Sequence, residues 1–223
     1  SQFDAIVVGS GISGGWAAKE LCERGLKVAL VERGRKVEHM ADYKTEVLAP
    51  WELPHRGFGD QAKYDRDYPQ QQGLYFNEWT EKFWVNDTEN PYEATGTKPF
   101  QWRRGYQLGG RSLTWGRHVF RRDDHDFEAN LKDGHGVDWP IRYADIAPWY
   151  KHVEEFIGVS GDAEDHVEGL PNSVFQAPFE MTEPEKAFRR SLIENYGGSR
   201  QAIIGRIAHL REAKEGRAPC QSR

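Results

Sequence analysis

The fold is decided by Asp4-Ala-Ile-Val-Val-Gly-Ser-Gly-Ile-Ser-Gly-Gly-Trp16, a stretch that passes from apolar residues into glycines. Its first five residues form a short, almost wholly apolar run, which is typical of a strand buried on both faces in a parallel sheet. From Trp16 to Arg24 the apolar residues fall on one helical stripe, and Gly25 ends the predicted helix. Residues 27–32 are a second apolar run. These segments have the size of a βαβ unit, so the sequence predicts an α/β, Rossmann-like parallel sheet with helices on its faces.

The glycines follow the spacing Gly9-x-Gly11-x-x-Gly14, between the first predicted strand and the helix. In a dinucleotide site the first glycine allows the tight turn, the second lets the backbone approach a pyrophosphate, and the third lets helix and strand pack closely. Glu32 ends the second strand, where a carboxylate can bind an adenosine ribose, which disfavours NADP. The motif alone leaves NAD and FAD open, and the alternative is a glycine-rich turn without a ligand.

Composition narrows the class of protein. The chain has 223 residues, a net charge of −5 and 13% aromatic residues. The negative charge argues against a nucleic-acid binder, which would need a basic face. The aromatic content argues against a disordered chain. No apolar run approaches the ~20 residues that a membrane span needs. We expect a globular protein in the cytoplasm, with the periplasm, reached by export with a partner subunit, as the alternative.

Three further segments have a recognisable character. Residues 35–104 hold many aromatic and charged residues without a clean period, which indicates either an irregular covering arm that packs on its own rings or a lid or subunit contact. Apolar residues at steps of three and four predict a helix over residues 143–158, with Asp145 as its N-cap, and another over residues 184–196. No spacing of Cys or His residues indicates a metal site.

A second glycine cluster, Gly109-Gly110-Arg-Ser-Leu-Thr-Trp-Gly116, lies after the arm. Together with residues 4–34, it resembles the glucose–methanol–choline (GMC) flavin oxidoreductases. Residues 126–127 and 138–150 make the resemblance closer to one branch, which contains gluconate 2-dehydrogenase large subunits, glucoside 3-dehydrogenases and pyranose oxidase relatives. The resemblance covers residues 4–34 and 105–161 well.

The resemblance implies FAD, with its ADP half on the first glycine motif and the second glycine loop against the flavin. Backbone N–H groups of Gly110 and Ser112 would meet the pyrophosphate or the isoalloxazine edge. Thr114 stands where some relatives carry the His that attaches FAD covalently, so we expect non-covalent FAD. Trp115 replaces an Asn that many members have. The predicted cofactor-binding residues are Gly9, Ser10, Gly11, Ser13, Gly14, Glu32, Arg33, Gly109, Gly110, Ser112, Leu113, Thr114, Trp115 and Gly116.

The activity that the resemblance implies is oxidation of a secondary alcohol of a sugar or glycoside to a ketone, by hydride transfer to the flavin. A dehydrogenase is favoured over an oxidase. The alternatives are a non-sugar alcohol as substrate, or a non-catalytic flavin-binding subunit of an electron-transfer complex. The family's catalytic base is a His near the end of a longer chain, so we expect this sequence to be the FAD-binding half, and His118 is a weak candidate within it.

The resemblance also divides the chain. Residues 1–34, about 105–130 and 199–223 are expected to form the FAD-binding domain, and about 135–198 the start of an incomplete α+β substrate domain. The partners expected are a sugar or glycoside substrate, a C-terminal half or a small partner subunit, and a cytochrome.

Overall fold

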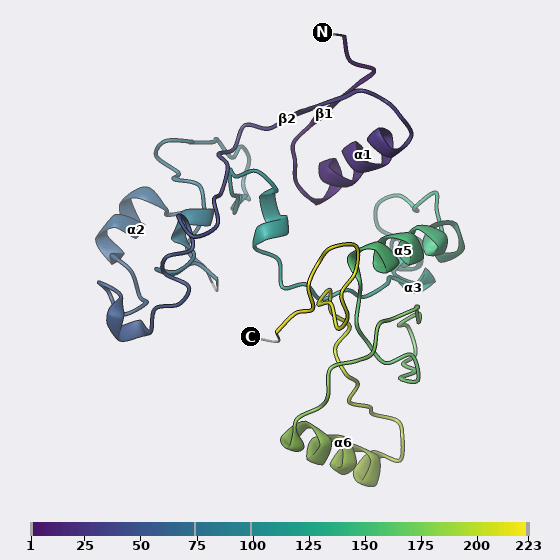
Figure 1. Cartoon of the computed structure of the whole chain (residues 1–223). Coiled ribbons are helices and arrows are strands. Elements are labelled where there is room, and N and C mark those ends of the chain that lie inside the picture. Colours follow the sequence, from purple (N-terminus) through teal and green to yellow (C-terminus); the bar gives the residue numbers. More distant parts are fainter. Residues whose placement is uncertain (1, 74, 99, 222–223) are drawn as a thin grey trace. The chain divides into compact units, whose positions relative to one another are not determined.

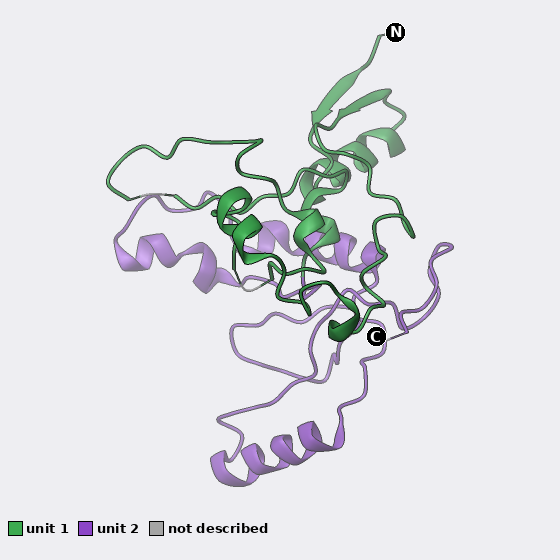
Figure 2. Cartoon of the chain, turned by 90° about the vertical axis from the view of Figure 1, so that its left-hand side faces the viewer, with its two compact units in different colours: residues 1–115 green, residues 116–223 purple. Residues whose placement is uncertain are grey.

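The computed structural model describes residues 2–73, 75–98 and 100–221, and the chain divides into two compact units (Figure 1). Unit 1 comprises residues 1–115 and unit 2 residues 116–223, as Figure 2 shows. The end residues of the predicted ranges 1–34 and 199–223, namely 1, 222 and 223, lie outside the described residues. The assignment of domains by function stays a prediction, and each unit is described by itself.

Unit 1 begins with the predicted βαβ module. Strand β1 (Ala5–Val8) pairs in parallel with β2 (Val28–Val31), and helix α1 (Ile12–Glu23) connects them. The N–H of Gly15 donates to the carbonyl of Gly11 at 2.8 Å, so the helix begins inside the glycine turn rather than at Trp16. The α/β class is therefore confirmed.

The two strands are not buried on both faces, as the sequence had indicated. Ile6 is 69% exposed and Val8 83% exposed, because α1 covers the opposite face, toward which Val7 points. Val31, the partner of Val8 in register, is also more than half exposed. Among the described residues of unit 1, no element covers this outer apolar face, so the sheet is half-buried.

The chain after β2 pairs with the segment that leads into the second glycine cluster. Arg35 forms a parallel bridge with Gln107, and the N–H of Leu108 donates to the carbonyl of Arg35 at 2.8 Å. The approach is so close that a Cβ on Gly34 would lie 2.4 Å from the backbone nitrogen of Gln107. This pairing brings two sequence segments, separated by the whole aromatic arm, to the same end of the βαβ module.

The arm over residues 35–104 packs largely on its own rings. The ring of Phe76 lies 4.6 Å from that of Tyr64 and 5.2 Å from that of Tyr68, measured between centroids. Beside them the fully buried amide of Gln71 donates to Asp87 at 2.7 Å. Regular structure in the arm is limited, among the residues described there, to helix α2 (Gln61–Asp67) and the 3-10 turns η1 (Pro50–Glu52) and η2 (Glu81–Phe83).

Unit 2 is built from helices α3 (Asp124–Phe127), α4 (Ala129–Asp133), α5 (Tyr143–Ile157) and α6 (Glu183–Tyr196). In its described part the extended segments pair only through single bridges, such as that of Ser160 with Ile207. No helix of the described residues, in either unit, is long and apolar enough to cross a membrane.

Both long helices lie close to where the sequence predicted them. Helix α6 ends before Gly197, which has a φ of 55°, and α5 ends before Gly158, which has a φ of 76°. Asp145 is not the N-cap of α5, because the helix starts at Tyr143 and Asp145 accepts a hydrogen bond from the N–H of Arg142 at 2.8 Å. Its carboxylate therefore caps the helix from the third position, as in a capping box.

A buried ion pair holds α5 to the rest of unit 2. The guanidinium of Arg121 donates from Nε and Nη2 to the carboxylate of Glu154, at 3.0 and 2.5 Å. Tyr143 and Ser173 hydrogen-bond to the same pair. Both charged side chains are almost fully buried, so each depends on the other for its solvation.

We expect Glu154→Gln to destabilise unit 2 by about 3 kcal/mol, because it leaves the Arg121 charge buried without a carboxylate. Chemical denaturation followed by far-ultraviolet circular dichroism measures this. The matched control is Glu155→Gln, the next residue of α5, whose carboxylate is exposed and lies 3.8 Å from Lys151. That change should cost less than about 0.5 kcal/mol, and equal costs for the two variants would contradict the prediction.

Candidate cofactor site

The first glycine turn joins β1 to α1 in a close-packed conformation that includes a left-handed residue. Gly9 has a φ of 89°, in the left-handed region, and its N–H donates to the carbonyl of Val31 at 2.7 Å. A Cβ on Gly14 would lie 1.9 Å from the carbonyl oxygen of Gly9. Both positions therefore require glycine for reasons internal to the fold.

Gly11 differs from its two neighbours in the motif. Its φ of −65° and ψ of −172° suit any residue, and a Cβ there would meet no described atom within 4 Å. Neither strain nor packing against the described chain accounts for a glycine here. Gly11 is also the N-cap of α1, where no side chain of the described residues caps the helix and the first turn carries no acid. An open backbone at the positive end of a 12-residue helix fits a pyrophosphate.

Ser10 connects this turn to the end of β2. Its N–H and its hydroxyl both donate to Oε2 of Glu32, at 2.8 and 2.6 Å. The N–H of Gly34 donates to Oε1 at 2.8 Å. Hydrogen bonds from the hydroxyl and the N–H of Ser10, and then from Gly34, lower the pKa of Glu32 to about 2. Glu32 is thus a structural tie between β1 and β2.

This tie bears on the ribose-binding role predicted for Glu32. A carboxylate offers about four acceptor positions, and the hydrogen bonds from Ser10 and Gly34 take three of them. The backbone of Arg33 also hydrogen-bonds to this carboxylate and lowers its pKa further. The ribose-binding role of Glu32 stays a prediction. Sequence reasoning missed this structural role of Ser10. The available signal was a serine directly after Gly9.

The second glycine cluster docks on the first through the same serine. Its 3-10 turn η3 (Gly110–Leu113) follows Gly109, whose φ is 89°. The N–H of Gly109 donates to Oγ of Ser10 at 2.8 Å. A Cβ on Gly110 would lie 3.3 Å from Cα of Gly11, so the two glycine backbones approach closely. The structure therefore brings both predicted loops together within unit 1.

The backbone N–H groups that the sequence suggested as ligand donors in this second loop form hydrogen bonds within the loop itself. The N–H of Gly110 donates to the carbonyl of Gln107 at 2.9 Å, and the N–H of Ser112 to that of Gly109 at 3.1 Å. The hydroxyl of Ser112 donates to the same carbonyl of Gly109 at 2.6 Å. Because the 3-10 turn needs these bonds, the two N–H groups are not free donors for a ligand, contrary to the sequence-based expectation.

The remaining predicted residues lie in two places. In unit 1 the guanidinium of Arg33 lies 3.8 Å from the centroid of the Tyr106 ring. The predicted residues Ser13, Leu113 and Thr114 are exposed there, and Trp115 is half-buried. Two others belong to unit 2, namely Gly116 and His118.

The catalytic candidate His118 is anchored within unit 2. It forms an antiparallel bridge with Ile207, and its ring stacks on that of Phe120 with centroids 6.3 Å apart. The neighbouring His209 has a pKa lowered by burial and by the nearby charges of Arg117 and His118. The catalytic role of His118 stays a prediction.

The geometry of unit 1 defines a dinucleotide-binding βαβ module that suits a flavin nucleotide. The family model of the FAD dependent oxidoreductases matches residues 4–138, more than half of the chain. The chain belongs to this family, and the resemblance to flavin oxidoreductases noted in the sequence is confirmed. FAD is accordingly its cofactor.

The chain is similar to three proteins, among others, along most of its length. It is 29% identical to 6'''-hydroxyparomomycin C oxidase of Streptomyces lividus, over 98% of this chain and 34% of that protein. It is 29% identical to paromamine 6'-oxidase of Streptomyces fradiae, over 73% and 24% of the two chains. It is 24% identical to the fructose dehydrogenase large subunit of Gluconobacter japonicus, over 80% and 31%. The chain thus spans about a third or less of the length of these relatives.

The residues present fit FAD at two points. The open backbone of Gly11 and the uncapped start of α1 suit the pyrophosphate, and Glu32 stands directly after β2, where the adenosine ribose is expected. Ser10 fixes the second loop beside that position. The arrangement can hold and orient a dinucleotide.

The low pKa of Glu32 gives a pH-dependent contribution to stability. The folded pKa of about 2 lies below the usual 4.5, so this stabilisation is complete above pH 4.5 and is lost as the pH falls toward 2. Ser10→Ala removes the largest cause of the shift. We expect this variant to lose about 1–3 kcal/mol at pH 7. The loss should shrink toward pH 2 without vanishing, because the hydrogen bond from the Gly109 N–H to Ser10 Oγ does not depend on pH. Urea unfolding at pH 7, 4.5, 3 and 2 measures the difference.

The control for that experiment is Ser13→Ala, since Ser13 is exposed in the first turn of α1. The free energy of unfolding of this variant should differ from that of the wild type by the same amount at every pH. A Ser10→Ala profile parallel to the wild type would contradict the tie between Ser10 and Glu32.

Gly11→Ala should separate cofactor binding from folding. The new methyl group meets no described protein atom, so folding should change by less than about 1 kcal/mol. It would occupy the space of the pyrophosphate, so we expect the Kd for FAD to rise at least about tenfold, or 1.4 kcal/mol. Titration of FAD fluorescence measures this. Gly15→Ala, whose Cβ makes an ordinary 3.8 Å contact, is the control and should bind FAD normally.

Proposed function

We propose that this chain is the FAD-binding part of an oxidoreductase that oxidises a secondary alcohol of a sugar or glycoside to a ketone. The observation that carries the proposal is the joining of two glycine loops through Ser10, within the region that matches the FAD dependent oxidoreductase family. The relatives named as aminoglycoside oxidases and as a fructose dehydrogenase subunit support the sugar-like substrate.

The roles of the residues follow from the geometry. When bound, FAD accepts the hydride that leaves the alcohol carbon. Gly11 and the start of α1 bind its pyrophosphate, and Glu32 binds the ribose while holding β1 and β2 together. The second loop, held by Ser10, orients the flavin end. Thr114 cannot form a histidyl bond, so the cofactor is held without a covalent link.

The base that removes the hydroxyl proton completes the proposed reaction. We assign it to the part of these proteins that this chain does not span, with His118 as the weak candidate within the 223 residues. We favour a dehydrogenase, with a small partner subunit or a cytochrome as the electron acceptor. The name of the fructose dehydrogenase large subunit, which implies other subunits, supports this arrangement.

Anaerobic reduction of the flavin tests the substrate class. The FAD-loaded protein, in the form in which it is isolated, should lose its absorbance near 450 nm when a glycoside is added, and keep it with choline or a sterol. The reverse pattern would favour the alternative, a non-sugar alcohol. Retention of colour with every alcohol, together with normal reduction by dithionite, would favour a non-catalytic flavin subunit. Acid precipitation should release all FAD into the supernatant.

A further inference from the structure

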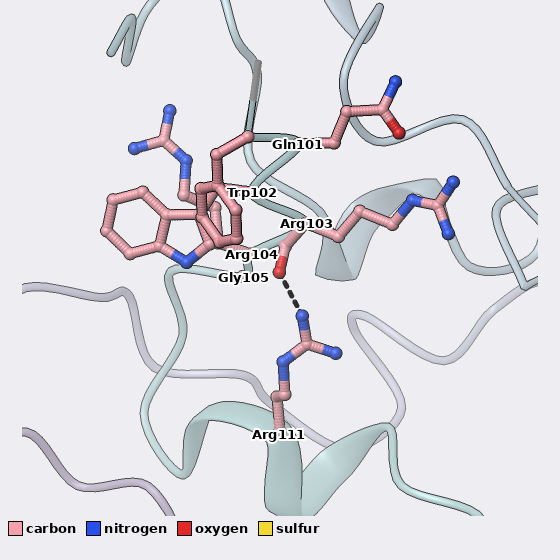
Figure 3. Close-up of a pocket in the computed structure, with 7 residues that line it drawn as sticks. Gln101, Trp102, Arg103, Arg104, Gly105 and Arg111 are labelled. Atoms are coloured by element: carbon pink, nitrogen blue, oxygen red, sulfur yellow. Dashed lines mark hydrogen bonds between the residues drawn. The ribbon is translucent and has the colours of Figure 1, made fainter. Parts of the chain in front are cut away.

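Unit 1 contains a hollow that the proposed function does not use. It has a volume of about 490 Å³ and is lined by residues 100–105 together with Arg111 (Figure 3). This volume lies within the range of small-molecule sites. The charged side chains among its described lining residues are all positive, namely Arg103, Arg104 and Arg111. A hollow with this lining attracts an anion.

Two of the three guanidiniums are positioned at the hollow with donors to spare. Nη2 of Arg103 donates to the carbonyl of Gln72 at 3.1 Å, and its Cζ lies only 2.7 Å from where a Cβ on Gly73 would stand. Arg111 approaches from the other side and donates to the carbonyl of Arg103 (Figure 3). Each of these contacts uses one of five N–H donors, so both groups can still bind an anion in the forked geometry of arginine.

The third guanidinium, that of Arg104, lies behind an aromatic wall and is partly satisfied within the fold. It donates to the Tyr106 hydroxyl at 2.8 Å and to the carbonyl of Asn90. Arg104 is 6% exposed, and its Nε has no hydrogen-bond partner among the described residues. Its guanidinium lies 4.9 Å from the centroid of Trp102, and its nearest carboxylate, Asp87, is 4.0 Å away. A buried N–H without a partner is costly, and a nearby anion would offset part of that cost.

The hollow also offers flat apolar surface. Trp102 is 46% exposed and Phe100 65% exposed, although both are large rings. The N–H of Trp102 donates to the Tyr92 hydroxyl at 2.7 Å, and its carbonyl accepts from Nε2 of Gln71 at 3.3 Å. These two hydrogen bonds hold the backbone of Trp102 in place. A ring carried by the anion can stack on such a surface.

We propose that this hollow binds an aromatic or heterocyclic phosphate ester. The phosphate lies between Arg103 and Arg111, and the ring lies against Trp102. The lining residue Arg111 belongs to η3 in the second glycine loop, so the hollow adjoins the proposed FAD site at this residue. Binding of this ligand does not depend on the proposed oxidation of an alcohol.

The experiment is calorimetric titration of the FAD-loaded protein at low salt with three probes, namely phenyl phosphate, inorganic phosphate and phenol. Phenyl phosphate should bind, inorganic phosphate about tenfold more weakly, and phenol without detectable heat. The flavin absorbance should stay unchanged throughout. Equal binding of phenyl phosphate and phenol, or release of FAD by phenyl phosphate, would overturn the proposal.

Substitutions of Arg103 and Trp102 test the contributions of the charge and of the ring separately. Arg103→Gln should weaken phenyl phosphate at least about tenfold, whereas Arg66→Gln, an exposed arginine paired with Asp67, should leave it unchanged. Trp102→Leu should bring phenyl phosphate down to the affinity of inorganic phosphate, and Trp102→Phe should retain most of the difference. Equal effects of the two arginine changes would also overturn the proposal, and circular dichroism confirms that each variant is folded.

Discussion

The hydroxyl of Ser10 is the contact on which the arrangement of unit 1 depends. It donates to Glu32 at the end of β2 and accepts from the N–H of Gly109, so it connects three segments that are distant in sequence. The hydrogen bonds that Ser10 donates to Glu32 are the main cause that lowers the pKa of this carboxyl to about 2. Together with the pairing of Arg35 and Gln107, this joint fixes the two glycine loops relative to each other. The cofactor site is therefore assembled around a protein side chain before any ligand is bound.

The local features of the fold could be predicted from the sequence, and the long-range ones could not. The spacing of glycines after an apolar run indicated β1, α1 and β2, and helical periodicity indicated α5 and α6. The pairing of Arg35 with Gln107 has no local signal, since it depends on how the arm folds back. In the same way, glycine identity at Gly110 predicted a loop but not that its N–H would be used within a 3-10 turn.

Two buried arginines, Arg121 and Arg104, are satisfied in different ways. In unit 2, Arg121 has Glu154, Tyr143 and Ser173 around its guanidinium, and the pair is satisfied within the fold. In unit 1, Arg104 is packed among rings, and its Nε is left without a partner. The first arrangement serves stability. The second keeps the charge of Arg104 4.0 Å from Asp87 and leaves one N–H unpaired beside an open hollow.

The exposed outer face of β1 and β2 has a practical consequence for handling the protein. Ile6, Val8 and Val31 present apolar surface to water on a two-stranded sheet. Salts such as ammonium sulfate strengthen the attraction between apolar surfaces, and cooling weakens it. The polypeptide produced on its own will therefore salt out early in a fractionation, and it will keep best in dilute buffer on ice.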